Sequence, residues 1–552
     1  MKKIYYILLS FLYFPLIASA QIEHNDSTVS RTVVVEQEYN PIIQDASKIT
    51  ILPAVEELTA PKHEVAYDYS MIPARRLLPV AMRPLFAPEY EQQVKPGYLR
   101  LGYGNYNNLD VVANYLFRIS TVDKLNVHFT MDGMSGKIKG DENSPYKWDS
   151  HFFNSKAGVS YLHQFEKLDF IAGVDYGLVN FNYFPQYASF SKQKFQSAGV
   201  KLGVESNEKS GRFQYLWNTS VLFYGRDQDV IDQNLKENII RSVGEIKTAI
   251  GSEQSIAIGL AMDNYLYNHD SLKNFTALGL KPHYLYESDE WKIRLGAQVD
   301  FGFGFGKKAH FAPDVAINYI FADRYSFFGT VKGGRIANDF RALQEFNPYM
   351  NLANERPQDS FEKINGQLGF KASPLNGVWF KIYGGHQRIS DDLYVWNELI
   401  SSEELRYHKL FQTNTNNTYL GADLTYEYQD VVGLSLNTVY RKWKADDELA
   451  LFNKPTLSLD FSMKYSPLMN LTGFLGFLYE KRDEVEILPA VGDGFTDKME
   501  PVSNLYAGLS YNLFKGINIY ARANNLLNKK YQYYLNYPTE GISILGGMSF
   551  TF

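Results

Sequence analysis

The chain of 552 residues contains no cysteine. Disulfide bonds, thiolate nucleophiles and cysteine metal ligands are therefore excluded, and so is the lipid-anchored N-terminus of a bacterial lipoprotein. Beyond the N-terminal 20 residues, no stretch has the roughly 18 consecutive apolar residues of a membrane-spanning helix. The formal net charge of -6 is small for this length. No basic run is present, so the sequence predicts no nucleic-acid partner.

The motifs of common catalytic and metal sites are also missing. The 10 histidines are scattered, and none stands at the spacing of a His-x-x-x-His or Glu-x-x-His metal site. No Gly-x-Ser-x-Gly nucleophile motif occurs. The sequence therefore predicts no enzyme, no catalytic residue and no cofactor. Asp391 with Asp392, and Asp483 with Glu484, offer the oxygen ligands that calcium prefers, but solvated loop charge explains these pairs equally well.

Aromatic residues are abundant, at 15% of the chain with 41 Tyr and 37 Phe. The mean hydropathy is nevertheless negative, at -0.29, which argues against a helical membrane protein. A transmembrane β-barrel combines both properties, because only every second residue of each strand faces lipid.

The N-terminus has the three parts of a secretory signal peptide. Lys2 and Lys3 are basic, residues 4–17 are apolar, and Ala18-Ser19-Ala20 is a small-x-small cleavage site. We predict a signal peptide over residues 1–20 and a mature chain that begins at Gln21. The alternative is a membrane-anchoring helix, for which the apolar run is short.

Residues 21–96 differ from the rest of the chain because prolines interrupt them throughout. The prolines stand at 41, 53, 61, 73, 79, 84, 88 and 96. Frequent proline opposes helices and central strands and favours extended backbone. We predict a short extended segment without a core of its own, either periplasmic or occluding a lumen.

From Gly97 onward, apolar and polar residues alternate over stretches of about ten residues. In residues 456–465 the apolar face is Leu457, Leu459, Phe461, Met463 and Tyr465. Residues 168–178, 420–428 and 543–552 alternate in the same way. Such stretches predict strands with different solvents on their two faces, and their length fits a tilted membrane span. We predict an all-β fold over residues 97–552, a transmembrane antiparallel β-barrel.

The connections predict the number of strands. Short polar turns lie near 120–124, 164–167, 207–211, 251–254, 287–290, 322–324, 373–377, 429–433, 466–470 and 514–516. Longer polar loops lie near 134–150, 334–360, 387–417, 481–501 and 525–542. Two strands for each turn, one strand near 97–104 and one at 543–552 give about 22 strands, with the short turns in the periplasm. A β-propeller or a soluble sandwich is the alternative, but no blade signature occurs.

The C-terminal stretch carries a more specific signal. Residues 525–531 read Asn-Leu-Leu-Asn-Lys-Lys-Tyr, and the chain ends in LGGMSFTF. Residues 518–552 resemble the end of TonB-dependent receptors, which are 22-stranded outer-membrane transporters. The resemblance implies that Phe550 and Phe552 belong to an assembly signal read by the barrel-insertion machinery. Where the family usually has Gly-Arg before the last strand, this chain has Glu540-Gly541-Ile542.

The second departure from this family is the plug domain, for which residues 21–96 are too short. The chain therefore looks like a receptor barrel without a full plug, of a Bacteroides-type lineage. A barrel of about 22 strands has a wide lumen and is normally plugged. Residues 21–96, in-folded long loops or a partner protein are the candidates, and we favour the first two together.

Two stretches of the N-terminal segment are candidate partner-binding or lumen segments. Arg31-Thr32-Val33-Val34-Val35-Glu36 resembles the energy-coupling box of the same receptors, which adds a strand to a partner's sheet. The alternative for Val33, Val34 and Val35 is ordinary strand pairing. Tyr39, Asn40 and Pro41 form either a docking anchor or a packed linker.

Two functions follow from this interpretation. The first is a gated or occluded channel for solute transport across the bacterial outer membrane. The alternative is a non-transporting barrel subunit, a scaffold of an outer-membrane assembly or secretion complex. The expected partners are outer-membrane lipid, the barrel-insertion machinery and, in the alternative, other outer-membrane or periplasmic proteins.

Overall fold

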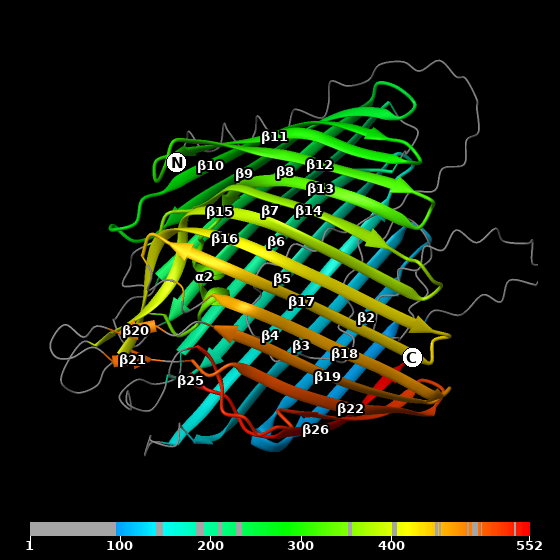
Figure 1. Cartoon of the computed structure of the whole chain (residues 1–552), viewed down its shortest axis with the longest axis vertical. Coiled ribbons are helices and arrows are strands. Elements are labelled where there is room, and N and C mark those ends of the chain that lie inside the picture. Colours follow the sequence, from blue (N-terminus) through cyan, green and yellow to red (C-terminus); the bar gives the residue numbers. More distant parts are fainter. Residues whose placement is uncertain are drawn as a thin grey trace, which may run out of the picture. The chain divides into compact units, whose positions relative to one another are not determined.

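The described strands from Gly97 onward form one closed antiparallel barrel. The computed structural model describes residues 95–139, 147–183, 193–207, 212–227, 235–350, 356–399, 406–447, 451, 454–482, 485–487, 495–497, 499–534 and 537–552. In these residues, 22 strands form a single sheet in which each strand pairs with the next barrel strand along the chain. The last strand, β26 (Ser543–Thr551), also pairs with the first, β1 (Gly97–Gly104), and this pairing closes the barrel (Figure 1). None of the helices among these residues has the length and apolar character that a membrane crossing needs.

The other barrel strands are long and follow one another in hairpins. They are β2 (Leu109–Arg118), β3 (Asp123–Lys139), β4 (Lys147–Gln164), β5 (Leu168–Phe181), β6 (Gln193–Ser206), β7 (Phe213–Asp227), β8 (Leu235–Ala249), β9 (Gln254–Tyr267), β10 (Phe275–Glu287), β11 (Trp291–Phe303), β12 (Ala309–Phe321), β13 (Tyr325–Ile336), β14 (Ser360–Ala372), β15 (Val378–Leu399), β16 (Arg406–Tyr428), β17 (Val432–Ala445), β18 (Pro455–Leu468), β19 (Leu471–Arg482), β22 (Val502–Phe514) and β23 (Ile517–Asn524). A 3-10 turn, η2 (Asn105–Asn107), joins β1 to β2. One short helix, α2 (Phe340–Phe346), lies between β13 and β14.

The predicted strand number and turns are confirmed. Each of the ten predicted turns falls between two successive barrel strands, and β1 and β26 occupy the two predicted terminal positions. A closed barrel of 22 antiparallel strands, with apolar side chains on its outer wall, is the architecture of the bacterial outer membrane, and the protein is a barrel of that membrane.

The prediction of a loop at 387–417 is wrong. β15 and β16 continue through most of this stretch as paired strands, from Arg388 opposite Asn416 to Leu399 opposite Arg406. Strand pairing needs only backbone hydrogen bonds, whereas the sequence signal was the apolar period. These residues lie beyond the lipid-facing part of the wall, so that period is absent from them.

Two other predicted loops contain small hairpins. β20 (Val485–Ile487) pairs with β21 (Phe495–Asp497), and β24 (Gln532–Tyr534) pairs with β25 (Tyr537–Pro538). Each forms a sheet separate from the barrel. The predicted loop at 134–150 is shorter than expected, because β3 extends to Lys139 and β4 begins at Lys147.

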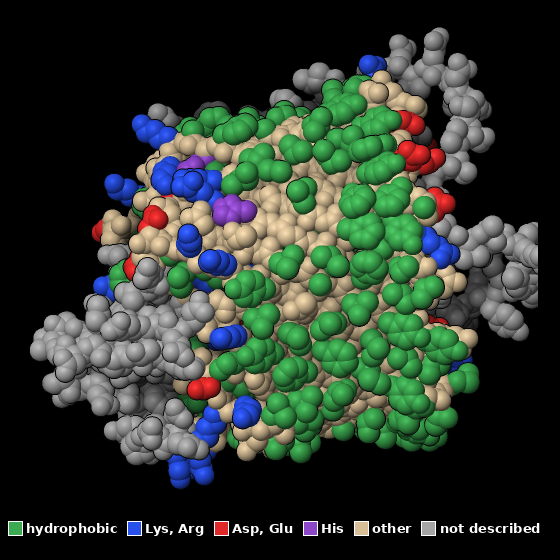
Figure 2. All heavy atoms as spheres, viewed as in Figure 1, with side chains coloured by type: hydrophobic (Ala, Val, Ile, Leu, Met, Phe, Trp, Pro, Cys, Tyr) green, Lys and Arg blue, Asp and Glu red, His purple; other side chains and the backbone are tan. Residues whose placement is uncertain are grey.

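The two faces of the wall have different chemistry. On the outer face, Leu420 and Tyr440 are opposite each other and are 60% and 56% exposed. On the inner face, Lys381 and Asp423 are also opposite each other and form an ion pair of 3.8 Å. Figure 2 shows apolar side chains over much of the visible face of the outer wall. This is the alternation that the sequence predicts, with lipid on one side and water on the other.

Aromatic rings gather on the outer wall close to the short turns. Between β11 and β14 the rings of Trp291 and Tyr319 are 4.5 Å apart, and those of Phe327 and Phe370 are 5.0 Å apart. Phe321 connects the two pairs, at 5.8 Å from Tyr319 and 5.4 Å from Phe327. Aromatic side chains at this level form the girdle that anchors a barrel at the membrane boundary.

On the inner face, aromatic side chains lie flat over glycines of the neighbouring strand. A Cβ atom on Gly476 would lie 2.0 Å from the ring of Tyr506, its direct partner across the strands. A Cβ atom on Gly547 would lie 2.7 Å from the Tyr520 ring, also a direct partner. Four more pairs share this arrangement: Phe328 with Gly369, Tyr383 with Gly421, Tyr419 with Gly385, and Phe474 with Gly508. Part of the abundant tyrosine and glycine therefore serves this cross-strand packing on the inner face.

We predict that Gly476→Ala destabilises the barrel. The added methyl group overlaps the Tyr506 ring, and overpacking of this kind typically costs about 1–3 kcal/mol. The matched control is Gly546→Ala, since the atom closest to a Cβ there lies at 3.7 Å, an ordinary contact. Heat-dependent mobility in gel electrophoresis measures the unfolding temperature of each variant. A Gly476→Ala barrel as stable as the control would contradict the close packing.

Candidate functional site

The connection between β13 and β14, residues 337–359, folds into the barrel. The structure describes residues 337–350 and 356–359 of it. Helix α2 begins after Asp339, whose carboxylate accepts a hydrogen bond from the Ala342 amide at 2.9 Å. Phe340 and Leu343 are completely buried on one side of the helix. Pro348 follows the helix and prevents its continuation.

Beyond α2 the connection reaches walls far from β13. Tyr349 stacks on Tyr537 of β25 with ring centroids 3.6 Å apart, and its edge meets Phe181 of β5 at 5.5 Å. Tyr349 also lies 6.3 Å from the ring of Trp148 on β4. β4 and β13 are the fourth and thirteenth of the 22 barrel strands, so they are nine strands apart. In a closed barrel of 22 strands, two strands that lie directly opposite each other are eleven strands apart. The connection therefore crosses the lumen.

Polar contacts hold the crossing segment to the wall at β7. The Tyr224 hydroxyl donates to Oε1 of Gln344 at 2.9 Å. The guanidinium of Arg226 donates to the backbone oxygen of Met350 and lies 4.7 Å from the centroid of the Phe195 ring. Tyr224, Arg226, Phe195 and Met350 are all buried, so these contacts exclude water from this side of the lumen.

An ion-pair network fixes the two ends of the connection to β8, β9 and β13. Arg241 donates to Asp263 at 2.7 Å and is 3.4 Å from Asp339 at the start of α2. Arg335 also pairs with Asp263 and donates to Asp359 at 2.7 Å. We call the following residues the ion-pair network: Arg241, Asp263, Arg335, Asp339, Arg356 and Asp359.

Arg356 and Asp359 form its most buried pair, with side chains only 3% and 14% exposed and a separation of 2.7 Å. The Arg356 guanidinium also lies 4.2 Å from the Phe275 ring and 4.8 Å from the Tyr265 ring, which stack on each other. Burial alone would raise the pKa of Asp359, but the charges of Arg356 and Arg335 outweigh it. The pKa of Asp359 therefore lies below its usual value, and the carboxylate is charged at neutral pH.

A fully buried carboxyl group, that of Glu237 on β8, binds the start of α2. Its Oε2 accepts from the Phe340 amide at 3.0 Å, and its Oε1 accepts from the Tyr267 hydroxyl at 2.8 Å. Both oxygens thus have donors from two different elements, the helix and β9. This contact positions α2 against the wall beside the ion-pair network.

The predicted site residues fall into two groups. Val33, Val34, Val35, Tyr39, Asn40 and Pro41 lie outside the residues that the structure describes. Phe552 lies at the closing seam, where its amide donates to the Gly97 oxygen at 3.0 Å and its oxygen accepts from the Gly97 amide at 2.8 Å. Phe550 is opposite Leu99 of β1 and Ile517 of β23. The assembly role of both phenylalanines stays a prediction.

The acidic pair Asp391 and Asp392 is engaged by lysines. Asp391 accepts from Lys307 at 2.6 Å, and Asp392 accepts from Lys454 at 2.7 Å. Within the part of the chain that the structure describes, no group of three or more His, Asp or Glu side chains is arranged to hold a metal ion.

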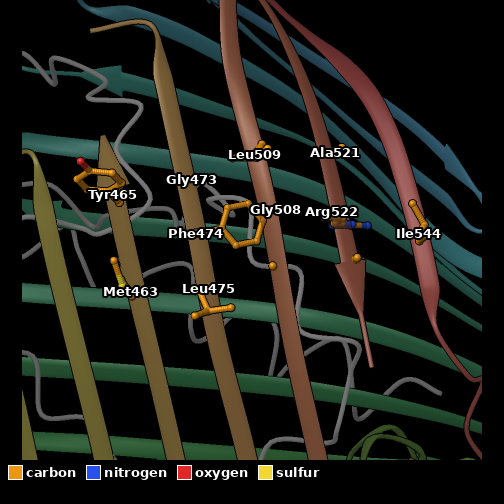
Figure 3. Close-up of a pocket in the computed structure, with 12 residues that line it drawn as sticks. Met463, Tyr465, Gly473, Phe474, Leu475, Gly508, Leu509, Ala521, Arg522 and Ile544 are labelled. Carbon is orange, nitrogen blue, oxygen red and sulfur yellow. The ribbon is translucent and has the colours of Figure 1, made fainter. Parts of the chain in front are cut away.

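A shallow hollow of about 420 Å³ lies across the neighbouring barrel strands β18, β19, β22, β23 and β26 (Figure 3). Small residues form its floor, among them Gly473, Ala507 and Ala521, and exposed Leu509 and Ile544 form part of its rim. These residues belong to the outer, lipid-facing face of the wall. The hollow therefore accommodates hydrocarbon chains and is not a solute site.

Sequence reasoning did not find the ion-pair network. The sequence did predict a loop at 334–360. It also predicted that in-folded long loops help to fill the lumen, and the structure confirms such in-folding for the β13–β14 connection. The charged partners, however, are distributed over β8, β9, β13 and the loop. The one available signal was the presence of charged residues on strand faces that were predicted to line the lumen.

Comparison with solved structures identifies the fold. P. aeruginosa FpvA bound to a heterologous pyoverdine is 11% identical, with a TM-score of 0.63 over 83% of this chain and 72% of its own. The siderophore receptor PirA from Acinetobacter baumannii is 10% identical, with a TM-score of 0.64 over 83% of this chain and 80% of its own. The FrpB iron transporter from Neisseria meningitidis is 11% identical, with a TM-score of 0.64 over 83% of this chain and 81% of its own.

These neighbours are TonB-dependent outer-membrane receptors, so the barrel has the fold that the C-terminal motif predicts. No protein-family model matches the sequence, and no curated protein matches it either. At 10–11% identity, the likeness shows the fold and does not show which solute this chain handles.

Proposed function

We propose that this protein is an occluded channel for solute transport across the outer membrane. The observation that carries the proposal is the β13–β14 connection, which crosses the lumen and contacts walls on both sides of it. A connection held by an ion-pair network is a closure that changes in the network can release. The proposal includes no catalytic role for any residue.

The fold supports transport more than the scaffold alternative. The solved neighbours are described as receptors and transporters for iron, siderophores or copper. A scaffold subunit binds its partners through outer surfaces. Its function does not require a polar connection that is held inside the lumen by ion pairs. Purification from the native membrane in mild detergent separates the two functions: stable co-purifying proteins would favour the scaffold.

We also propose that residues 21–96 contribute a second closure. They join β1 directly at Gly97, which lies at the end of the wall that carries the short turns. The resemblance to TonB-dependent receptors supports a periplasmic or lumenal place for this segment. Its Val33-Val34-Val35 and Tyr39-Asn40-Pro41 stretches are the proposed partner-binding positions, and Phe550 and Phe552 are proposed to be read by the insertion machinery.

Removal of residues 21–96 behind the signal peptide is predicted to raise solute flux about twofold. The increase is modest because the β13–β14 connection remains and acts in series. Liposome swelling with sugars of increasing size measures the flux. The control is a chain in which the same residues are scrambled in order. Equal flux for the full and shortened chains would reject the second closure and leave the first untouched.

A further inference from the structure

Four basic side chains form an unpaired patch on the outer wall at the loop end of β15, β17 and β19. Three of them lie ten positions after the first residue of their strand. These are Arg388 after Val378 on β15, Lys442 after Val432 on β17, and Lys481 after Leu471 on β19. Lys444 lies two positions beyond Lys442 on β17. We call Arg388, Lys442, Lys444 and Lys481 the outer basic patch.

The strand register places these side chains on the lipid side of the wall. Lys442 and Lys444 are two and four positions from Tyr440, which is opposite the exposed Leu420. Arg388 is opposite Asn416, four positions from Leu420. Lys481 is opposite Leu457, which is itself opposite Tyr440. Since residues an even number apart share a face of a strand, all four face outward with Leu420 and Tyr440.

Their height fits the membrane boundary. Ten residues of antiparallel strand extend about 34 Å, and at a tilt of 35–45° they rise about 25 Å, which is the usual height of the apolar band of a barrel. The outer basic patch therefore lies where the band ends and the lipid headgroups begin. Figure 2 shows the same change, with apolar side chains over the wall and Lys and Arg side chains gathered toward its left end.

No carboxylate of the described residues forms an ion pair with the patch. All four side chains are exposed, and none of them forms an ion pair there. Asp446, which directly follows β17, accepts a hydrogen bond from Asn414 at 2.7 Å, so one carboxylate stands beside four basic side chains. Four neighbouring cations that face outward at headgroup level attract anionic groups of the membrane surface.

We propose that the outer basic patch binds the phosphate groups of a phosphorylated glycolipid in the outer leaflet. Phosphate carries the charge and the acceptor oxygens that lysine and arginine recognise. Acyl chains of the same lipid lie along the apolar wall below the patch, over Leu420 and Tyr440. This inference depends on the membrane position of the barrel and not on whether it transports a solute.

The test measures binding of lipid A to the purified full chain in detergent by native mass spectrometry. Diphosphorylated lipid A is predicted to bind, and Lys442→Gln with Lys444→Gln to weaken binding at least about tenfold, since each cation near a headgroup adds to the attraction. The matched control is Lys194→Gln with Lys236→Gln, which removes two outward-facing lysines from β6 and β8. Heat-dependent gel mobility checks that all variants are folded.

The probes also separate the lipid from its phosphate alone. Dephosphorylated lipid A is predicted to bind weakly, and inorganic phosphate to compete only at far higher concentration than the glycolipid. Equal losses in the patch and control variants would overturn the proposal. So would equal binding of phosphorylated and dephosphorylated lipid A, or competition by inorganic phosphate at concentrations that match the glycolipid.

Discussion

Replacement of residues 338–357 by a short glycine-serine linker is expected to raise the single-channel conductance of the barrel severalfold. The replaced stretch carries α2 and Tyr349, which contact β7 and β5 on the opposite side of the lumen. The strand pairings of β13 and β14 do not include the replaced stretch, so all of them remain. The expected loss is therefore one of closure rather than of folding.

The measurement is conductance in planar bilayers, in both the full chain and the chain without residues 21–96. If two closures act in series, the combined variant shows the largest conductance, larger than either change alone. The matched control replaces the connection between β19 and β22, which contains the β20–β21 hairpin and forms its own small sheet. A linker variant that conducts no more than this control, in both backgrounds, would show that the β13–β14 connection does not close the pore.

The barrel was accessible from the sequence because lipid imposes a regular pattern. Each crossing strand needs an apolar residue at every second position, and each short turn interrupts that pattern with polar residues. Stretches such as 420–428 show it directly: Leu420, Leu424 and Tyr428 are exposed on the outer wall as predicted. The number of strands follows from counting these interruptions.

The parts beyond the membrane were not accessible in the same way. The loop-end halves of β15 and β16 pair as strands without a regular apolar period, so the sequence indicated a loop. The ion-pair network is harder still, because Asp263 and Asp359 are 96 positions apart and meet only through Arg335. Such contacts depend on the barrel radius and on the path of one connection, which no local pattern encodes.

The second large effect is expected from Asp359→Asn, which should convert the barrel from a mostly closed to a mostly open channel. The variant leaves the Arg356 guanidinium buried without its carboxylate and removes one of the two carboxylate partners of Arg335. Removing one member of a buried ion pair typically costs about 3–5 kcal/mol, which corresponds to a factor of about 10²–10⁴ in an equilibrium constant. Release of the connection into water avoids that cost, so the population of the open state increases.

Three comparisons make the Asp359→Asn experiment specific. Arg356→Met is expected to have a smaller effect, because Asp359 keeps Arg335 and the methionine still packs on Phe275. Asp391→Asn, which removes an exposed pair with Lys307, is expected to change little. In the unaltered protein, acid is expected to have the same effect as the mutation, because it protonates Asp359. The pKa of Asp359 lies below its usual value of about 3.9. The charged carboxylate therefore stabilises the closed state fully above roughly pH 4, and this stabilisation is lost only as the pH falls through the lowered pKa. Single-channel recordings at neutral pH that show the same open fraction for Asp359→Asn and Asp391→Asn would remove the ion-pair network from the closure.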